Sequence, residues 1–418
     1  MNLIYTWDSR PISFYVNGSG CISRDEIEME PQSAFLKTHV DQVVHCRGTK
    51  NAEGLIMIYT RNILPHAVFR VRLSGPEVHI VPFRHHSERL HYGQYSVARP
   101  GDYNVEVMML YTHFNETHIQ DSVYMNSTTL SSTSPFVVVS DRLSDSLSES
   151  SCDEFDTTWA VDDDGFWEYL RRTRTWEQDL WPEGHPMIHD LLPTINATGL
   201  KFESKCKRTT SYGLTDPVYI DCYKREKICM WGDSQMRHLY NTIVAALSLR
   251  SADALTDPLD GQESITYFSK HYDNFDEDID SLLASGKCSV IIANFGQWPA
   301  GSPQGYAWPF DKFRIYLEAD IVYLKRLEEK HSGVRTFWVT TNPHGYVEGM
   351  VAGTEWRTDP VLDQYHDITL QVALAHRMKA LDTYRIAKPL SDLAYDGSHF
   401  NGVVGWTLAN YILQNVCE

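Results

Sequence analysis

Short runs of alternating hydrophobic and polar residues dominate the chain up to about residue 140. Val71 and Leu73 alternate with polar neighbours, and Val105 and Val107 do the same. This period of two is typical of strands that bury one face. Glycine and proline separate the runs, so the pattern predicts an antiparallel β-sandwich. Strands are expected at residues 12–16, 55–59, 67–73, 78–81 and 103–107.

Beyond residue 226 the pattern changes to apolar strands that alternate with amphipathic helices. Residues 227–231 form a short apolar strand, and residues 288–293 have the continuous apolar character typical of a strand covered on both faces. This alternation predicts a parallel sheet flanked by helices, with functional residues just after the carboxyl ends of the strands. Helices are expected at residues 235–249, 277–283, 310–329, 362–381 and 403–413, and a further strand at 334–339.

These patterns divide the chain of 418 residues into a β-sandwich domain at 1–140, a linker at 141–165 and a catalytic-type domain at 166–418. The linker is rich in Ser, Asp and Glu. The predicted fold class is therefore α/β: a three-layer α/β/α sandwich with a parallel sheet, preceded by an N-terminal β-sandwich.

Charge and hydropathy exclude several classes of partner. The net charge of −18 argues against binding to nucleic acid or to an anionic membrane surface. No apolar run approaches the roughly 18 residues of a membrane-spanning helix. The first residues carry neither a basic segment nor an apolar one, so no signal peptide is visible.

Cysteine and glycosylation patterns favour a secreted protein or one of the secretory-pathway lumen, with a cytoplasmic location as the alternative. The chain has eight Cys, an even number, as disulfide-bonded proteins often do. Cys206, Cys222 and Cys229 precede the Gly232-Asp233-Ser234 motif, and a bridge among them is expected to brace the strand before it. Sequons for glycosylation occur at Asn17, Asn115, Asn126 and Asn196.

Two short motifs occupy positions where the predicted sheet would carry a site. Gly232-Asp233-Ser234 places a serine at a helix start, where backbone N–H groups can stabilise an oxyanion. Asp396 and His399 lie three residues apart before the last helix, so the carboxylate can orient the imidazole and leave Nε2 as a general base. Each motif alone is more simply explained as a helix cap, with a surface histidine in the second. Together, in the chain order Ser, Asp, His, they predict a catalytic triad.

Residues 160–418 resemble the SGNH or GDSL-type hydrolases, and most closely the PC-esterase branch. The resemblance rests on Trp231 to Arg237, on the Asp396 and His399 pair, and on the 294–298 block Asn-Phe-Gly-Gln-Trp. That branch includes neurexophilin and PC-esterase domain proteins, sialic-acid O-acetyltransferases and trichome-birefringence-like O-acetyltransferases. The oxyanion-glycine block of bacterial GDSL esterases is not recognisable at 251–287. The resemblance implies an SGNH-like sandwich, and the Pro-Gly-x-Tyr-x-Val-x-Val run resembles immunoglobulin-like or filamin domains.

Further residues near the motifs are candidates for the oxyanion and substrate site. Gly232, Asp233, Asn294 and Gly296 surround the predicted nucleophile, and an Asn amide can donate to an oxyanion or simply close a turn. Arg237 follows Ser234 by three residues, on nearly the same helix face. Its guanidinium can bind a carboxylate or polarise an acyl oxygen, or it can form a structural ion pair.

Four other side chains have a structural interpretation beside a functional one. His238 follows Ser234 by one helical turn and could compete as the base. Trp298 and Trp308 could stack on a sugar or pack in the core. His344 is either at the lip of a cleft or an ordinary loop residue.

The leading interpretation is a glycan O-acetyltransferase that acts through an acyl-Ser234 intermediate, with a carbohydrate acetylesterase as the alternative. A non-catalytic binding protein on an esterase-like scaffold is a second alternative, but it would lack a triad member, and none is missing. The expected partners are a carbohydrate substrate and an acyl donor. No P-loop or Gly-x-Gly-x-x-Gly run and no metal-ligand spacing is present in the sequence, so no cofactor and no metal is expected.

Overall fold

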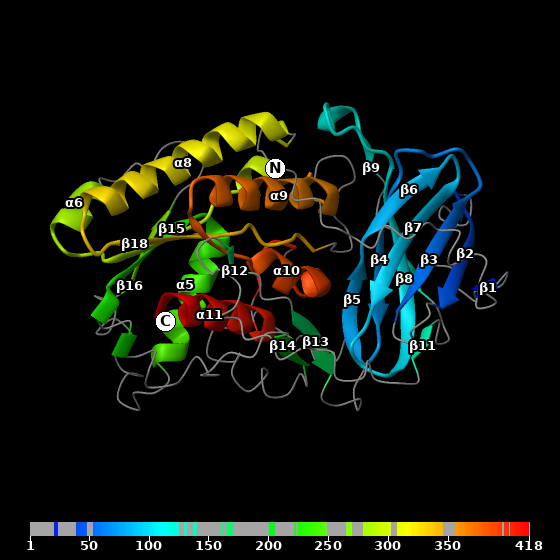
Figure 1. Ribbon diagram of the computed structural model, residues 1–418, viewed down its shortest axis with the longest axis horizontal. Coiled ribbons are helices and arrows are strands. Elements are labelled where there is room, and N and C mark those ends of the chain that lie inside the picture. The colour runs from blue at the N-terminus through cyan, green and yellow to red at the C-terminus, as the bar shows by residue number, and fades with distance from the viewer. Residues whose placement is uncertain are drawn as a thin grey trace. The chain divides into compact units, whose positions relative to one another are not determined.

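The alternating residues of the N-terminal part form antiparallel sheets in the computed structural model of the chain (Figure 1). The chain divides into one unit of Met1–Phe114 with Ser122–Ser148 and a second unit of Asn115–Asp121 with Glu149–Glu418. The structure describes residues 21–23, 39–47, 53–124, 129–131, 137–139, 160–161, 165–169, 200–204, 221–222, 225–248, 265–269, 279–301, 307–345, 356–394, 397–400 and 402–417. The strand expected at 12–16, most of the linker at 141–165, Cys206 and three of the four sequons lie outside them.

Two sheets make up the first unit. One has the order β1-β2-β3-β7-β6 and the other β10-β8-β4-β5, with β9 and β11 also pairing with β8. All of these pairs are antiparallel. The strands are β1 Cys21–Ser23, β2 Val40–Arg47, β3 Glu53–Thr60, β4 Val68–Ser74, β5 Glu77–Val81, β6 Phe83–Ser87, β7 Leu90–Ser96, β8 Gly101–His113, β9 Val123–Tyr124, β10 Thr129–Ser131 and β11 Val137–Val139.

An apolar core joins the two sheets of this unit. Val71 lies opposite Val107 in the register of β4 and β8, and both side chains are fully buried. They belong to one cluster with Ile56 and Ile58 of β3, in the other sheet. The strands expected at 55–59, 67–73, 78–81 and 103–107 are therefore confirmed, as is a sandwich of antiparallel sheets. Its likeness to immunoglobulin domains stays a prediction.

The second unit is built on a six-stranded sheet of order β12-β19-β18-β17-β15-β16 whose pairs are all parallel. β15 and β17 pair although β16 lies between them in sequence. This order, without β12, is that of flavodoxin-like folds, in which ligands bind beyond the switch point between the first and third strands. Here that point lies between β15 and β17. The strands are β12 Ala160–Val161, β15 Ile228–Gly232, β16 Ile265–Ser269, β17 Val290–Ala293, β18 Arg335–Val339 and β19 Lys379–Leu381.

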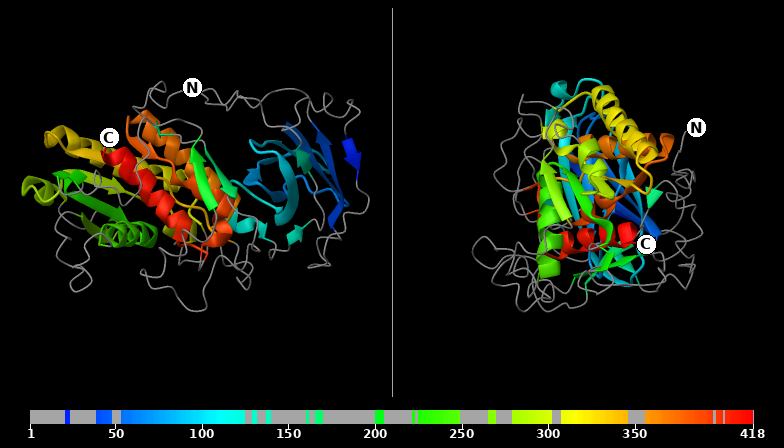
Figure 2. Two further views of the ribbon diagram at one scale, coloured as in Figure 1. Left: turned by 90° about the horizontal axis from the view of Figure 1, so that it is seen from below. Right: turned by 90° about the vertical axis from the view of Figure 1, so that its left-hand side faces the viewer.

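Helices cover both faces of this sheet. Figure 1 shows α8 and α9 on one side and α5 and α11 on the other, and Figure 2 shows α5 beside α11. The mixed α/β class and its three layers are thus as expected. The helices are α5 Ser234–Ser248, α6 Ile279–Ala284, α7 Gln297–Gly301, α8 Phe310–Lys330, α9 Asp359–Ala375, α10 Thr383–Ala387 and α11 Gly402–Cys417. Short 3₁₀ helices span Ile119–Asp121 and Lys388–Leu393, and β13 Gly165–Tyr169 pairs with β14 Leu200–Ser204.

The helix expected at 362–381 is wrong at its C-terminal end. α9 ends at Ala375, and Lys379–Leu381 form β19 instead. Arg377 has a φ of 55°, a left-handed conformation that ends a helix. Pairing with β18 then buries Ala380 and Leu381 completely, so tertiary contacts outweigh the helical pattern of the sequence. Ala160–Val161, within the range expected to be a linker, form β12 beside β19.

Among the described residues of the second unit, two disulfides join distant segments, Cys222–Cys417 and Cys229–Cys288. The bridge expected among Cys206, Cys222 and Cys229 is therefore wrong for Cys222 and Cys229, because each pairs with a distant cysteine. Cys229 lies on β15, so its bridge to the start of the β17 segment still braces the strand before Ser234. Disulfides persist in oxidising compartments, which favours an extracellular or secretory-lumen protein.

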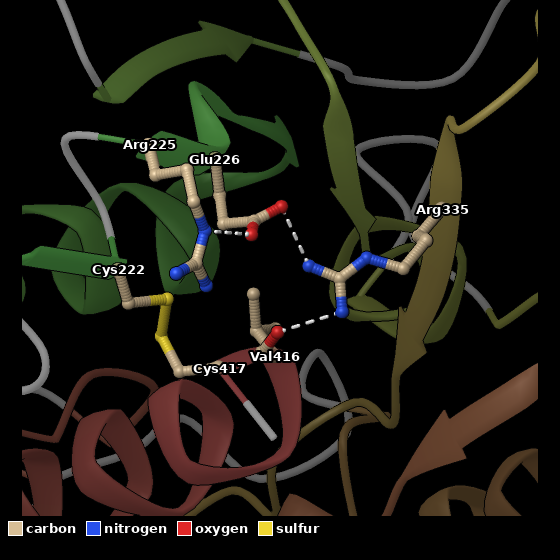
Figure 3. The surroundings of a disulfide bond; sticks show 6 residues. All are labelled: Cys222, Arg225, Glu226, Arg335, Val416 and Cys417. Carbon is tan, nitrogen blue, oxygen red and sulfur yellow. Dashed lines mark hydrogen bonds and ion pairs between the residues drawn. A yellow bond between two sulfur atoms is a disulfide. The ribbon is translucent and has the colours of Figure 1, made fainter.

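A charged cluster surrounds the Cys222–Cys417 bridge (Figure 3). The Arg335 guanidinium donates to Glu226 at 2.8 Å and to the carbonyl of Val416 at 2.9 Å. Arg225 donates to the other oxygen of Glu226 at 2.8 Å. Burial alone would raise the pKa of Glu226, but the two arginines outweigh it and hold that pKa below its ordinary value. The cluster and the bridge together fasten the end of α11 to the sheet.

In the part of the chain that the structure describes, no helix is both long and apolar enough to span a membrane.

Candidate active site

The serine of the Gly232-Asp233-Ser234 motif begins α5, directly after β15 and at the carboxyl edge of the sheet. Asp233 caps this helix, because its Oδ1 accepts the Gln235 N–H at 2.9 Å. Ser234 itself is therefore not needed as the cap. Its own N–H is one of the amides at a helix start that have no acceptor within the helix. The serine hydroxyl and this N–H are both available for chemistry.

Gly232 and Asp233 give this turn its shape. A Cβ at Gly232 would lie 2.7 Å from Cβ of Met236, so a larger residue would displace the helix start. Asp233 is 2% exposed. Burial raises the pKa of its carboxyl, while the Gln235 N–H and the nearby His399 ring act in the opposite direction. Both predicted residues thus lie at the site, and both support the helix start.

His399 lies against the serine, although 165 residues separate them. Its Nε2 is 2.6 Å from Oγ of Ser234, within hydrogen-bond distance. The ring comes from the segment that leads into α11, and it is half-buried. The geometry matches a serine whose proton a neighbouring imidazole can accept.

His238 lies one turn further along α5 and stacks on the His399 ring. The ring centroids are 4.3 Å apart and the planes are inclined by 26°. His399, not His238, makes the contact with Ser234 Oγ. His238 therefore packs against the His399 ring.

Asp396, the predicted third member of the triad, lies outside the described residues. Its role in orienting His399 stays a prediction.

Asn294 and Gly296 lie beyond β17, on the other side of the switch point. Asn294 is 1% exposed, and its Nδ2 donates to the carbonyl of Val339 at 2.9 Å. One of its two amide hydrogens is thus used in a hydrogen bond that links the ends of β17 and β18. Gly296 approaches Thr341 so closely that a Cβ there would lie 1.9 Å from Oγ1. Both residues fix the loop next to Ser234, and their role toward an oxyanion stays a prediction.

Arg237 lies on α5, one turn after Ser234, with an exposed side chain. No ion pair of Arg237 occurs among the residues that the structure describes. The alternative of a buried structural ion pair is therefore not supported there. An exposed guanidinium therefore lies one turn from Ser234.

Ser234 and His399 form a dyad. The aromatic and histidine candidates further from this dyad are packed into the protein. Trp308 is 5% exposed, contacts Phe295, and has Lys312 Nζ 3.9 Å above its ring. Trp308 therefore packs in the core and has no exposed ring face on which a sugar could stack. Trp298 is half-buried. His344 is 2% exposed, and its Nδ1 lies 2.8 Å from the Gly345 carbonyl, so it is no residue of a cleft lip.

The sequence interpretation missed a set of polar residues near the dyad: Gln235, Asn342 and Ser398, which are buried, and Arg357, which is half-buried. Gln235 bonds to the backbone of both Asn342 and Ser398. Arg357 Nη1 donates to Oγ of Ser398 at 2.5 Å. Their only signal in the sequence is that Gln235 and Ser398 are chain neighbours of Ser234 and His399. Among the described residues, no group of three or more His, Cys, Asp or Glu could hold a metal ion.

A buried His–Asp pair joins α9 to the residue that follows β19. Nε2 of His366 is 2.9 Å and 3.0 Å from the two oxygens of Asp382. Burial lowers the pKa of His366, but the Asp382 and Asp367 carboxylates together outweigh that effect and raise it to about 10. Asp382 also caps α10 through the Arg385 N–H. This pair is a structural ion pair rather than part of the dyad.

The His366–Asp382 pair should make stability depend on pH. Because the native pKa of about 10 exceeds the ordinary 6.5, the native state keeps a proton that the unfolded chain has lost. The stabilisation is complete below about pH 6.5 and is lost as the pH rises toward 10. Asp382→Asn should lower the free energy of unfolding by about 3–5 kcal/mol at pH 6, since the cap survives but the imidazolium loses its buried carboxylate partner and keeps only the exposed Asp367.

Urea unfolding followed by tryptophan fluorescence measures this, because every tryptophan except Trp7 lies in the second unit. His366→Gln should flatten the decline in stability between pH 6.5 and pH 10. If the free energy of unfolding of His366→Gln declines with pH as steeply as that of wild type, the pair does not cause the pH dependence.

No protein-family model and no curated protein matches the chain. Among solved structures, an acetyl xylan esterase aligns with 45% of this chain and 98% of its own, at 12% identity and a TM-score of 0.31. A protein described as an acylhydrolase, from Bacteroides fragilis, aligns with 46% of this chain and 88% of its own, at 13% identity and a TM-score of 0.31. A GDSL-like lipase from Parabacteroides merdae aligns with 46% of this chain and 94% of its own, at 12% identity and a TM-score of 0.30. At these identities and TM-scores, the alignments assign no activity to this chain.

Proposed function

We propose that the second unit is a serine-dependent acyl-transfer enzyme of the SGNH type that acts on acetyl esters of carbohydrates. The observation that carries the proposal is the 2.6 Å contact between His399 Nε2 and Ser234 Oγ. It occurs at a helix start beside the switch point of a parallel sheet, where such folds bind their ligands. The sequence resemblance to PC-esterases supports acetyl groups on glycans as the substrate class.

The chemistry follows from these positions. Ser234 Oγ attacks the acyl carbonyl while His399 Nε2 takes the hydroxyl proton. The Ser234 N–H, the Gly296 N–H and the second amide hydrogen of Asn294 are the proposed donors to the oxyanion. His399 then returns the proton to the departing alcohol oxygen, which leaves an acyl-Ser234. Asp396 is proposed to orient the imidazole and stabilise its charged form.

The second half of the reaction distinguishes the two enzyme classes. A sugar hydroxyl that attacks acyl-Ser234 makes the protein a glycan O-acetyltransferase, which we propose as the leading function. Water in the same place makes it a carbohydrate acetylesterase. His399 takes the proton of the attacking oxygen in both cases, so the same residues serve both. The disulfides fit work in the secretory lumen or outside the cell.

Partition of the acetyl group between water and sugar tests this proposal. The protein is given an activated acetyl ester with increasing concentrations of a free oligosaccharide, and acetate and acetylated sugar are both quantified. A transferase should form acetylated sugar at the expense of acetate, whereas an esterase should form acetate alone and also deacetylate acetylated sugars. Absence of both products, with ester consumption equal to that of buffer, would contradict the proposal.

Arg237 offers a separate test of substrate binding. Arg237→Ala should lower kcat/KM by at least about 10-fold, or about 1.4 kcal/mol, because an exposed guanidinium beside the nucleophile would be lost. Arg237→Lys should also lower it, since lysine keeps the charge but loses the planar fork. Melting temperatures should stay unchanged, because an exposed charge contributes little stability.

Arg326→Ala is the matched control, because Arg326 is an exposed arginine on α8 of the same unit. Its kinetics should equal those of wild type. Normal kinetics in both Arg237 variants would remove Arg237 from the site.

A further inference from the structure

The side chain of Gln235 connects three segments that meet behind the dyad. Gln235 is the residue after Ser234 and is 3% exposed. Its Nε2 donates to the carbonyl of Ser398 at 3.0 Å, and its Oε1 accepts the N–H of Asn342 at 3.0 Å. The partners are 163 and 107 residues away in the chain. One amide thus ties the start of α5 to the loop after β18 and to the segment that carries His399.

The bond to Ser398 bears most directly on the dyad. Ser398 immediately precedes His399, so its carbonyl moves with the backbone that positions the imidazole. The hydroxyl of Ser398 is also fixed, because Arg357 donates to it at 2.5 Å. Gln235 in turn follows Ser234, so the nucleophile and the base are connected through two adjacent residues as well as through their own contact.

The bond to Asn342 steadies the amide itself. With Oε1 on the Asn342 N–H, the NH₂ group of Gln235 can only face the Ser398 carbonyl and, more weakly, the Asn342 carbonyl at 3.5 Å. Gln297 Nε2 donates to the same Asn342 carbonyl at 2.7 Å, which fixes this loop from the α7 side. The orientation of the Gln235 amide is therefore set by the backbone around it.

We propose that Gln235 is a positioning residue, which holds the His399 segment at the distance from Ser234 that proton transfer requires. The proposal rests on the proposed function, because it takes Ser234 and His399 as the reacting pair. Misplacement of a reacting group by about 1 Å costs on the order of 100-fold in rate. Loss of the Gln235 bonds should accordingly slow the chemical step and leave ground-state binding nearly unchanged.

Two variants separate the contacts of Gln235. Gln235→Glu has the same shape and keeps the acceptor for Asn342, but it places an acceptor oxygen against the Ser398 carbonyl. Gln235→Met removes both bonds, because its side chain is apolar and of similar length. Asn415→Leu is the matched control, because Asn415 is a buried amide of α11 whose Nδ2 bonds to the Tyr411 carbonyl.

The measurement is phosphonylation of Ser234 by a small alkyl fluorophosphonate. Ser234 Oγ forms the bond to phosphorus, fluoride leaves, and His399 takes the proton. The limiting rate kinact and the half-saturating concentration KI are determined by peptide mass spectrometry. Each protein is measured at the same interval below its own melting temperature, so that loss of stability does not count as loss of rate.

Both Gln235 variants should lower kinact at least about 10-fold and leave KI within about threefold, while Asn415→Leu should match wild type. Wild-type kinact in any folded Gln235 variant overturns the positioning role, and so does an equal fall in Asn415→Leu. If one Gln235 variant does not fold, the other decides. A wild-type protein without label on Ser234 overturns the proposed function instead, so the two failures are distinguishable.

Discussion

Replacing Ser234 by alanine is expected to lower turnover of an acetyl ester by at least about 1,000-fold. The change removes the proposed nucleophile, whose hydroxyl lies 2.6 Å from His399 Nε2. Stability should change by less than about 1 kcal/mol, because the hydroxyl makes one hydrogen bond and Asp233, not Ser234, caps α5. Initial rates and urea unfolding measure the two effects.

Ser285→Ala is the matched control for this variant. The Ser285 hydroxyl also makes one hydrogen bond, to the Leu282 carbonyl, and lies after α6. The double variant Ser234→Ala/His399→Ala should be no slower than either single one, since the two residues act as a unit. Turnover of Ser234→Ala within tenfold of wild type would remove Ser234 as the nucleophile.

Asp396→Asn is expected to lower kcat by at least about 100-fold, with KM nearly unchanged. An amide in place of the carboxylate can hold the His399 imidazole in the tautomer that has no free Nε2 lone pair, and it cannot stabilise the imidazolium. Steady-state kinetics on the same acetyl ester measure the loss.

Asp392→Asn, four residues earlier, reports how sensitive this segment is to loss of a carboxylate. It should keep kcat within about threefold of wild type. If Asp396→Asn lowers kcat less than fivefold, Ser234 and His399 suffice for turnover and Asp396 has no catalytic role. If both variants lose activity equally, the loss comes from the segment rather than from Asp396.

Much of the fold could be predicted because its signals are local. The alternation at Val71 and Val107 reports which side of a strand faces the core, and the structure buries both. The end of the helix expected at 362–381 was wrong because a segment as short as Lys379–Leu381 fits a strand or a helix equally well. Pairing with β18 decides between them, and that contact is not visible in the sequence.

The site shows the same division between local and distant information. Ser234 and His399 could be named because each sits where a parallel sheet gathers its functional residues, and the structure brings them to 2.6 Å. The role of Gln235 could not be foreseen, because it depends on backbone groups more than 100 residues away. The cysteine pairing failed for a similar reason, since Cys222 bonds to Cys417 across 195 residues.

The central claim is that an acyl group passes through Ser234, and its most direct test is to find that group there. The protein is mixed with an activated acetyl ester, quenched in acid during the first turnovers, and digested for peptide mass spectrometry. The account predicts acetyl on the Ser234 peptide of wild type, none in Ser234→Ala, and faster loss of the label when a glycan acceptor is added. Acetyl on another residue, or turnover that persists in Ser234→Ala, would contradict it.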